Sequence, residues 1–240
     1  MLRQIIERTI TRAKGVDVRI DPAVETSHLV GLARRQAFAL MRGLFRWRAP
    51  IYLEPGVQFR GRGRIRIGRS SKIGARTLIE GLSKEGVEIG AGVTLGRYGR
   101  IRATATLTQI GKGVRIGDYV GIGDFFYLGA FGGIDIGPET IVGERLTIHS
   151  DNHDFDDVST AIRRQATTAM PVSIGARCWF GSNVTILGGV EIGDDCVIGA
   201  GSVVTRSFPA GSIIVGNPGR MVRNRFDRAP SATIAPSGQE

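Results

Sequence analysis

Cysteine, histidine and aromatic residues are scarce in this chain. Its 240 residues include two cysteines and three histidines, and aromatic residues make up 7% of the sequence. The two cysteines permit one disulfide at most. We expect both to be small buried residues of the fold. We expect both to remain reduced, because the cytoplasm is the default compartment.

A long hydrophobic run is also missing. No apolar stretch reaches the roughly 18 residues that a membrane-spanning helix needs. Residues 1–14 are charged throughout and lack the apolar core of a secretory signal. The expected location is therefore the cytoplasm, and peripheral contact with the inner face of the membrane stays open.

Acidic residues are outnumbered. The formal net charge is +10, and five arginines but no acidic residue lie between His28 and Arg48. Such an excess is typical of proteins that meet nucleic acid, anionic membranes or phosphorylated ligands. No nucleic-acid-binding module is recognisable, so we expect no nucleic-acid partner.

Large apolar residues recur every six residues in the last third of the chain. They are Ile174, Phe180, Ile186, Ile192, Ile198 and Val204. The period fits neither an α-helix nor an isolated strand, but it fits a solenoid whose coils of about 18 residues contain three short strands each. Ile174 should then stack on Ile192, Phe180 on Ile198, and Cys178 should lie next to Cys196. Glycines after the apolar residues should suit corners that need backbone freedom or a positive φ.

The same period runs upstream and predicts one continuous solenoid, with short outward loops at seams near residues 80–87, 102–109 and 129–135. It includes Ile67, Ile73, Ile79, Ile89, Leu95, Ile101, Ile110, Ile116, Ile122, Leu128, Ile136, Val142 and Ile148. We predict an all-β chain with three parts: an N-terminal helical and basic segment (1–50), a parallel β-helix (51–223) and a disordered tail (224–240). Residues 28–47 are predicted to form an amphipathic helix that covers the solenoid end, docks on a neighbouring subunit or lies on an anionic membrane.

The six-residue period breaks once, and the break reads His149-Ser-Asp-Asn-His153-Asp-Phe-Asp-Asp157. We predict an extruded loop over residues 149–171. A polar, histidine-bearing interruption of a regular scaffold is a candidate catalytic site, because an imidazole with an ordinary pKa near 6.5 can accept a proton at neutral pH.

Residues 171–223 carry a family resemblance. They read Pro171-Val-Ser-Ile-Gly-Ala-Arg-Cys-Trp-Phe-Gly-Ser and continue to Gly216-Asn-Pro-Gly-Arg220. The segment resembles the hexapeptide-repeat acyltransferases, and the Ser150-Asp-Asn-His loop looks most like the bacterial cell-surface polysaccharide and maltose-type O-acetyltransferases. The resemblance implies a left-handed parallel β-helix, a homotrimer with active sites between subunits, and acetyl-CoA as co-substrate.

The resemblance also assigns roles to residues. It implies that His153 is the general base. A neighbouring carboxylate could orient the other ring nitrogen, and Asp154, Asp156 and Asp151 are all candidates for this role, with Asp154 taken first. It places coenzyme A against Ser182, Ala200, Thr205, Arg206, Arg220 and Arg223. Trp179 is a corner aromatic residue that either flanks the thioester or packs. His149, Asn152 and Tyr127 are candidates for acceptor binding, and the aromatic segment 125–133 would offer a platform for a sugar ring.

The expected function is acetyl transfer from acetyl-CoA to a sugar hydroxyl of a cell-surface polysaccharide or its precursor. N-acetylation of an amino-sugar nucleotide is the main alternative. A zinc-dependent lyase and a non-catalytic scaffold are less favoured. The third histidine, His28, lies in the predicted N-terminal helix, so we expect no metal.

Overall fold

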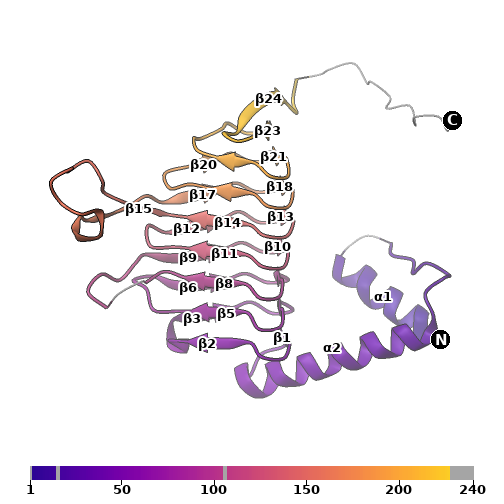
Figure 1. Ribbon diagram of the computed structural model, residues 1–240. Helices are drawn as coiled ribbons and strands as arrows, with labels where there is room; N and C mark the ends of the chain where they lie inside the picture. Colours follow the sequence, from indigo (N-terminus) through magenta and orange to yellow (C-terminus); the bar gives the residue numbers. More distant parts are fainter. Residues whose placement is uncertain (1, 15–16, 105–106, 228–240) are drawn as a thin grey trace.

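A computed structural model describes residues 2–14, 17–104 and 107–227. Short strands wind into a left-handed parallel β-helix, a three-sided prism that stands on a long N-terminal helix (Figure 1). The all-β fold predicted from the six-residue period is confirmed. Each coil places one strand in each of three sheets, here called A, B and C in the order in which the chain visits them.

Sheet A contains nine strands. In spatial order they are β1 (Tyr52–Leu53), β4 (Lys72–Ile73), β7 (Thr94–Leu95), β10 (Gly121–Ile122), β13 (Ile141–Val142), β18 (Trp179–Phe180), β21 (Val197–Ile198), β23 (Ser212–Val215) and β24 (Arg220–Asn224). The last pair, β23 and β24, is antiparallel, while the other neighbours are parallel.

Sheets B and C complete the prism. Sheet B contains β2 (Gln58–Arg60), β5 (Leu78–Glu80), β8 (Arg100–Arg102), β11 (Tyr127–Gly129), β14 (Thr147–His149), β19 (Thr185–Ile186) and β22 (Val203–Val204). Sheet C contains β3 (Ile65–Ile67), β6 (Gly86–Ile89), β9 (Gly113–Ile116), β12 (Ile134–Ile136), β17 (Val172–Ile174) and β20 (Glu191–Ile192).

The large apolar residues fill the prism as the period predicts. Ile174 pairs in register with Ile192 and Phe180 with Ile198, and all four are buried. Ile110 is the exception, because it is 37% exposed and precedes β9. The connection before β9 is longer than the period suggested.

Cys178 and Cys196 are buried and free, and they lie side by side in adjacent coils. The adjacent Cys196 thiol and burial raise the pKa of the Cys178 thiol, which donates to the Gly193 carbonyl oxygen at 3.3 Å. The predicted stacking of the two cysteines is therefore confirmed, and the structure pairs them as thiols.

The glycines that follow the apolar residues serve close packing rather than a positive φ. A Cβ on Gly181 would lie 2.5 Å from the backbone nitrogen of Ala200 in the next coil. The left-handed conformation falls two residues later, at positions such as Asn183 with φ 59°. The expectation of positive φ at these glycines is wrong, because each corner turns at the third residue after the buried one.

The N-terminal segment forms α1 (Leu2–Lys14) and α2 (Thr26–Trp47). Helix α2 covers the first coil, where Gly43 meets the carbonyl group of Ile51 and Arg42 Nε donates to the Leu53 carbonyl oxygen at 2.7 Å. The predicted helix over 28–47 is confirmed, and it packs against the open end of the prism (Figure 1). None of the described helices is long and apolar enough to cross a membrane.

The predicted tail begins later than expected. Asn224 still belongs to β24, and its amide Nδ2 donates to the Ala210 carbonyl oxygen at 2.8 Å. The turn after β24 extends through residue 227. Residues 228–240, the rest of the predicted tail, lie outside the described residues.

Candidate active site

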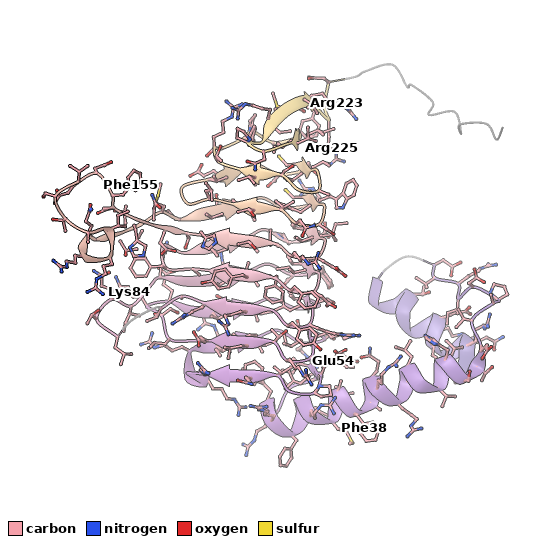
Figure 2. All side chains as sticks on the ribbon, in the orientation of Figure 1. Phe38, Glu54, Lys84, Phe155, Arg223 and Arg225 are labelled. Carbon is pink, nitrogen blue, oxygen red and sulfur yellow. The ribbon has the colours of Figure 1, made fainter. Side chains whose placement is uncertain are left out.

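The polar break becomes a two-stranded hairpin that leaves the prism between sheets B and C. Strand β15 (Asp151–His153) pairs antiparallel with β16 (Thr167–Ala169), so that His153 faces Thr167. A short 3-10 helix, Ile162–Arg164, lies in the part of the loop between them. The loop projects from one edge of the prism, and the labelled Phe155 lies on it shortly after β15 (Figure 2). His149 still belongs to β14 and pairs with Gly129 of β11, so the loop leaves the solenoid one residue after the predicted start at residue 149.

Ser150 fixes the base of the hairpin. Its side chain is fully buried; Oγ donates to the Gly129 carbonyl oxygen at 2.8 Å and accepts from the Gly132 amide at 2.9 Å. The loop is therefore tied to the preceding coil at its first residue outside the solenoid. Sequence reasoning missed this residue, although a small hydroxyl side chain directly after a predicted strand end was a usable signal.

The His153 imidazole is exposed and has a hydroxyl neighbour. Nδ1 lies 3.4 Å from Thr167 Oγ1. Asp154, predicted to support the ring, instead accepts a hydrogen bond from Thr168 Oγ1 at 2.7 Å. Alternation along β15 explains the difference, because consecutive side chains point to opposite faces of a strand. The carboxylate on the His153 face of β15 is that of Asp151.

Two cavities meet at His153. One, of about 540 Å³, is lined by His149, Asp151, Asn152, His153, Met170, Leu187, Gly188 and Thr205. We call it the upper cavity. The other, of about 290 Å³, lies between the solenoid edge and the loop and is lined by residues that include Arg102, Tyr127, Phe131, Asp151, His153 and Arg163. We call it the lower cavity. Asp151 and His153 line both, whereas Asp156 lines neither.

The aromatic segment 125–133 does not form one platform. Phe125 stacks on Tyr98 at a centroid distance of 5.1 Å at the corner between sheets A and B, and Phe126 is buried. Tyr127 lies beside the His149 ring at 5.5 Å. Tyr127 and Phe131 are thus the aromatic residues of this segment that reach the lower cavity.

The residues assigned to coenzyme A divide into two groups. The first group lies by the loop: Thr205 lines the upper cavity, and the guanidinium of the next residue, Arg206, lies 5.2 Å from the centroid of the Phe208 ring. The second group lies along sheet A and includes Trp179, which is 56% exposed between Ile141 and Val197.

The other members of the second group lie on the same side of the prism. Ser182 and Ala200 follow strands β18 and β21 of sheet A, and the Ser182 Oγ accepts from the Glu144 amide at 3.2 Å. Arg220 and Arg223 belong to β24 of sheet A. Figure 2 labels Arg223 at the C-terminal end of the solenoid. One chain therefore does not gather all the assigned residues around His153.

Metal-binding side chains do not cluster. Across residues 2–14, 17–104 and 107–227, no three His, Cys, Asp or Glu side chains lie together as a metal site would require.

Comparison with known proteins identifies the family. A model of the hexapeptide repeat of succinyl-transferase matches residues 171–206. The protein named "Putative colanic acid biosynthesis acetyltransferase WcaF" of Escherichia coli K12 is 32% identical over 136 residues, which are 57% of this chain and 71% of the relative. The chain belongs to the hexapeptide-repeat acyltransferases.

A second relative agrees with this assignment, and two solved structures share the fold. A probable acetyltransferase of Mycobacterium tuberculosis is 32% identical to this acyltransferase over 164 residues, which are 68% of this chain and 51% of that protein. The polysialic acid O-acetyltransferase OatWY shares the fold with a TM-score of 0.51 at 18% identity, over 75% of this chain and 93% of its own. The N-acyltransferase AntD of Bacillus cereus, crystallised with dTDP and 3-hydroxybutyryl-CoA, has a TM-score of 0.51 at 19% identity. The match covers 73% of this chain and 80% of the AntD chain.

Proposed function

We propose that this acyltransferase moves the acetyl group of acetyl-CoA to a hydroxyl of a sugar in a cell-surface polysaccharide or its precursor. The observation that carries the proposal is the position of His153, which lines two neighbouring cavities at once. A base that serves a two-substrate transfer must reach the acceptor hydroxyl while the donor carbonyl carbon lies within bonding reach of the same oxygen. The WcaF relative supports a polysaccharide acceptor by its name.

The transfer needs no covalent enzyme intermediate. The acceptor oxygen attacks the thioester carbonyl carbon, the new C–O bond forms and the C–S bond breaks. His153 takes the hydroxyl proton and returns it to the leaving thiolate. With its proton on Nδ1 and donated toward Thr167 Oγ1, the neutral ring presents Nε2 as the acceptor of that proton. Asp154 contributes by holding Thr168 on the opposite strand of the hairpin.

The divided donor residues support assembly of the site between subunits. Trp179, Ser182 and Ala200 lie on sheet A or directly after its strands, whereas His153 and Thr205 lie between sheets B and C. In a homotrimer of parallel prisms, sheet A of one subunit would meet the loop of the next. Coenzyme A would then lie between subunits, with Arg220 and Arg223 at its phosphates, because the guanidinium fork matches phosphate oxygens.

Mixed oligomers test the assembly. His153→Ala and Ala200→Trp should each inactivate the pure protein. Mixed trimers of the two variants should regain part of the activity, because some interfaces then combine an intact loop with an intact sheet A. Absence of recovery in a mixture shown to contain hybrid trimers would place each complete site within one chain.

Product analysis tests the reaction. We expect release of coenzyme A thiol that depends on a sugar acceptor, and a product ester that neutral hydroxylamine cleaves. An acetyl product that resists hydroxylamine and forms with an amino sugar would instead establish N-acetylation. Thiol release with no dependence on any sugar or amino sugar would argue against both functions.

We further propose that the outer face of α2 rests on anionic lipid. Apolar residues on this face remain exposed although the opposite face packs on the prism; they are Val30, Phe38, Met41, Leu44 and Phe45. Phe45 is 93% exposed, and the surrounding helix carries arginines but no acid, as expected for a helix on an anionic surface. Figure 2 labels Phe38 on α2, at the end of the prism far from β24.

Vesicle sedimentation tests this contact. Vesicles that contain phosphatidylserine should retain the protein more than pure phosphatidylcholine vesicles do, and salt should weaken retention. Phe45→Glu should release the protein from the vesicles. Phe155→Glu, on the exposed catalytic loop, should not. Equal retention of the two variants would refute the contact.

A further inference from the structure

The lower cavity has an excess of positive charge beside the proposed general base. Arg102 and Arg163 both line it, and Asp151 is the one acidic residue among its lining side chains. Arg102 comes from the end of β8 on the solenoid, while Arg163 comes from the 3-10 helix of the extruded loop. The two guanidinium groups therefore reach the cavity from different parts of the fold.

Arg102 is held in place by the solenoid. Its Nε donates to the Thr104 carbonyl oxygen at 3.1 Å and lies 3.4 Å from Glu80 Oε2. The same carboxylate receives a hydrogen bond from Arg60 Nη1 at 2.9 Å. Two arginines thus share one glutamate, which leaves one positive charge in excess at this edge.

Arg163 has no comparable partner. No hydrogen bond or ion pair reaches its guanidinium within the part of the chain that the structure describes. Its neighbour Arg164 is equally exposed but lines neither cavity. An unpaired guanidinium in a cavity next to a catalytic base is a ready partner for a carboxylate or phosphate, which it can bind through two parallel hydrogen bonds.

The size of the lower cavity limits what it can hold. At about 290 Å³ it lies just below the usual range of small-molecule sites, roughly 300–1,000 Å³, so that one sugar ring fits better than a whole nucleotide sugar. Tyr127 and Phe131 supply apolar surface for the ring, and Gln109 supplies hydrogen-bonding groups. The Gln165 amide nitrogen already donates to the carbonyl oxygens of Asp157 and Thr160 within the loop. The anionic group must then be carried on the ring itself.

We infer that the acceptor is an acidic sugar, whose anionic substituent binds to Arg163 and Arg102 while a hydroxyl of the same ring faces His153. The inference rests on the proposed acetyl transfer to a sugar. The anion is a ring carboxylate or a phosphate ester on the ring, since both match the guanidinium fork. The arginines do not take part in the transfer; they select and orient the acceptor.

A matched set of acceptors tests the inference. The p-nitrophenyl glycosides of glucuronic acid, glucose and glucose 6-phosphate differ only at C6. This carbon belongs to a carboxylate in the first, a neutral alcohol in the second and a phosphate ester in the third. We expect kcat/KM to be at least about 10-fold higher for one of the anionic glycosides than for the neutral one. The preferred anion then distinguishes a carboxylate from a phosphate.

Arg163→Gln should abolish this preference. We expect a loss of about 10- to 100-fold in kcat/KM for the anionic acceptor, mainly through KM, with little change for the neutral glycoside and for the KM of acetyl-CoA. Arg164→Gln is the matched control and should behave like the wild type. Calorimetry of the glucuronide should show the same loss of affinity in Arg163→Gln without any turnover.

Other outcomes separate the two proposals. Equal kcat/KM for the anionic and neutral glycosides, together with equal binding, would overturn the acidic-acceptor inference but leave acetyl transfer to sugars intact. A uniform loss for all three glycosides in Arg163→Gln would reduce this arginine to a structural part of the loop. Binding of the glucuronide without acetylation of any glycoside would support the subsite and count against the proposed function.

Discussion

The Thr167 hydroxyl and the His153 ring face each other across the β15–β16 hairpin, with 3.4 Å between Oγ1 and Nδ1. Thr167 is thereby the side chain placed to orient the imidazole through Nδ1. A carboxylate commonly orients a catalytic histidine, but here the neighbouring Asp154 holds Thr168 instead. Thr167 is a positioning residue, because it acts through His153.

Thr167→Val should lower kcat by about 10-fold, because the ring loses the hydrogen-bond partner that orients it. Thr167→Ser should restore most of the activity, since it keeps the oxygen. The pH–rate profile should shift in the valine variant and not in the serine variant. A serine variant as slow as the valine variant, with an unchanged profile, would mean that Thr167 merely packs in the hairpin.

Ser150→Ala should destabilise the protein by about 1–3 kcal/mol, because the buried Gly132 amide loses its acceptor. The hairpin should also become mobile at its base and kcat should fall, although Ser150 does not line either cavity. Chemical denaturation and steady-state rates measure the two effects. Ser173→Ala, on the exposed face of sheet C, is the control and should change neither.

Two glycines of α2 should respond in opposite ways to the same substitution. A Cβ at Gly43 would overlap the backbone carbonyl of Ile51, so Gly43→Ala should cost about 1–3 kcal/mol or detach α2 from the first coil. Gly31 has open space around its Cα, so Gly31→Ala should stabilise the helix by up to about 1 kcal/mol. Thermal unfolding of both variants tests whether α2 truly packs on the prism end. Equal effects would contradict that packing.

Glu54 should make stability depend on pH where the first coil meets α2. Burial alone would raise the pKa of Glu54, but the Lys72 ammonium, the Ala75 amide and Arg97 outweigh it and hold the pKa below its ordinary value. A lowered folded-state pKa stabilises the fold above the ordinary value near 4.3, and this stabilisation is lost as pH falls through the folded-state value.

Glu54→Gln should therefore destabilise the protein near pH 7 and make little difference in acid. Urea unfolding at both pH values gives the two differences in free energy. Glu85→Gln serves as control, because its 3.9 Å ion pair with Lys112 is exposed. A Glu54→Gln effect that persists unchanged in acid would contradict the assigned cause.

The sequence predicts the scaffold well because each coil repeats the same physical requirement. An apolar residue at every sixth position must stack on its counterpart, so that the register of Phe180 on Ile198 follows from the spacing alone. Ile110 departed from the prediction because a long connection can imitate one repeat by chance. The roles of the corner glycines were misjudged, since contact with the next coil cannot be deduced from a single repeat.

The site was predictable in position but not in detail. His153 stands out as a histidine in the long polar break of the period, whereas Thr167 and Arg163 come from the far side of the loop. Their approach to His153 depends on how β16 pairs with β15 in the hairpin. This pairing produces no repeating pattern in the sequence. The carboxylate expected beside the ring was assigned by proximity in sequence, and strand alternation turned it to the other face.

Steady-state thiol release by His153→Ala tests the account most directly. With the acceptor that the wild type prefers, we predict a drop of about 100- to 10,000-fold in kcat, unchanged thermal unfolding and unchanged binding of acetyl-CoA. His28→Ala, on α2, is the matched control and should turn over like the wild type. Full turnover by a folded His153→Ala protein would contradict the assignment of His153 as the general base.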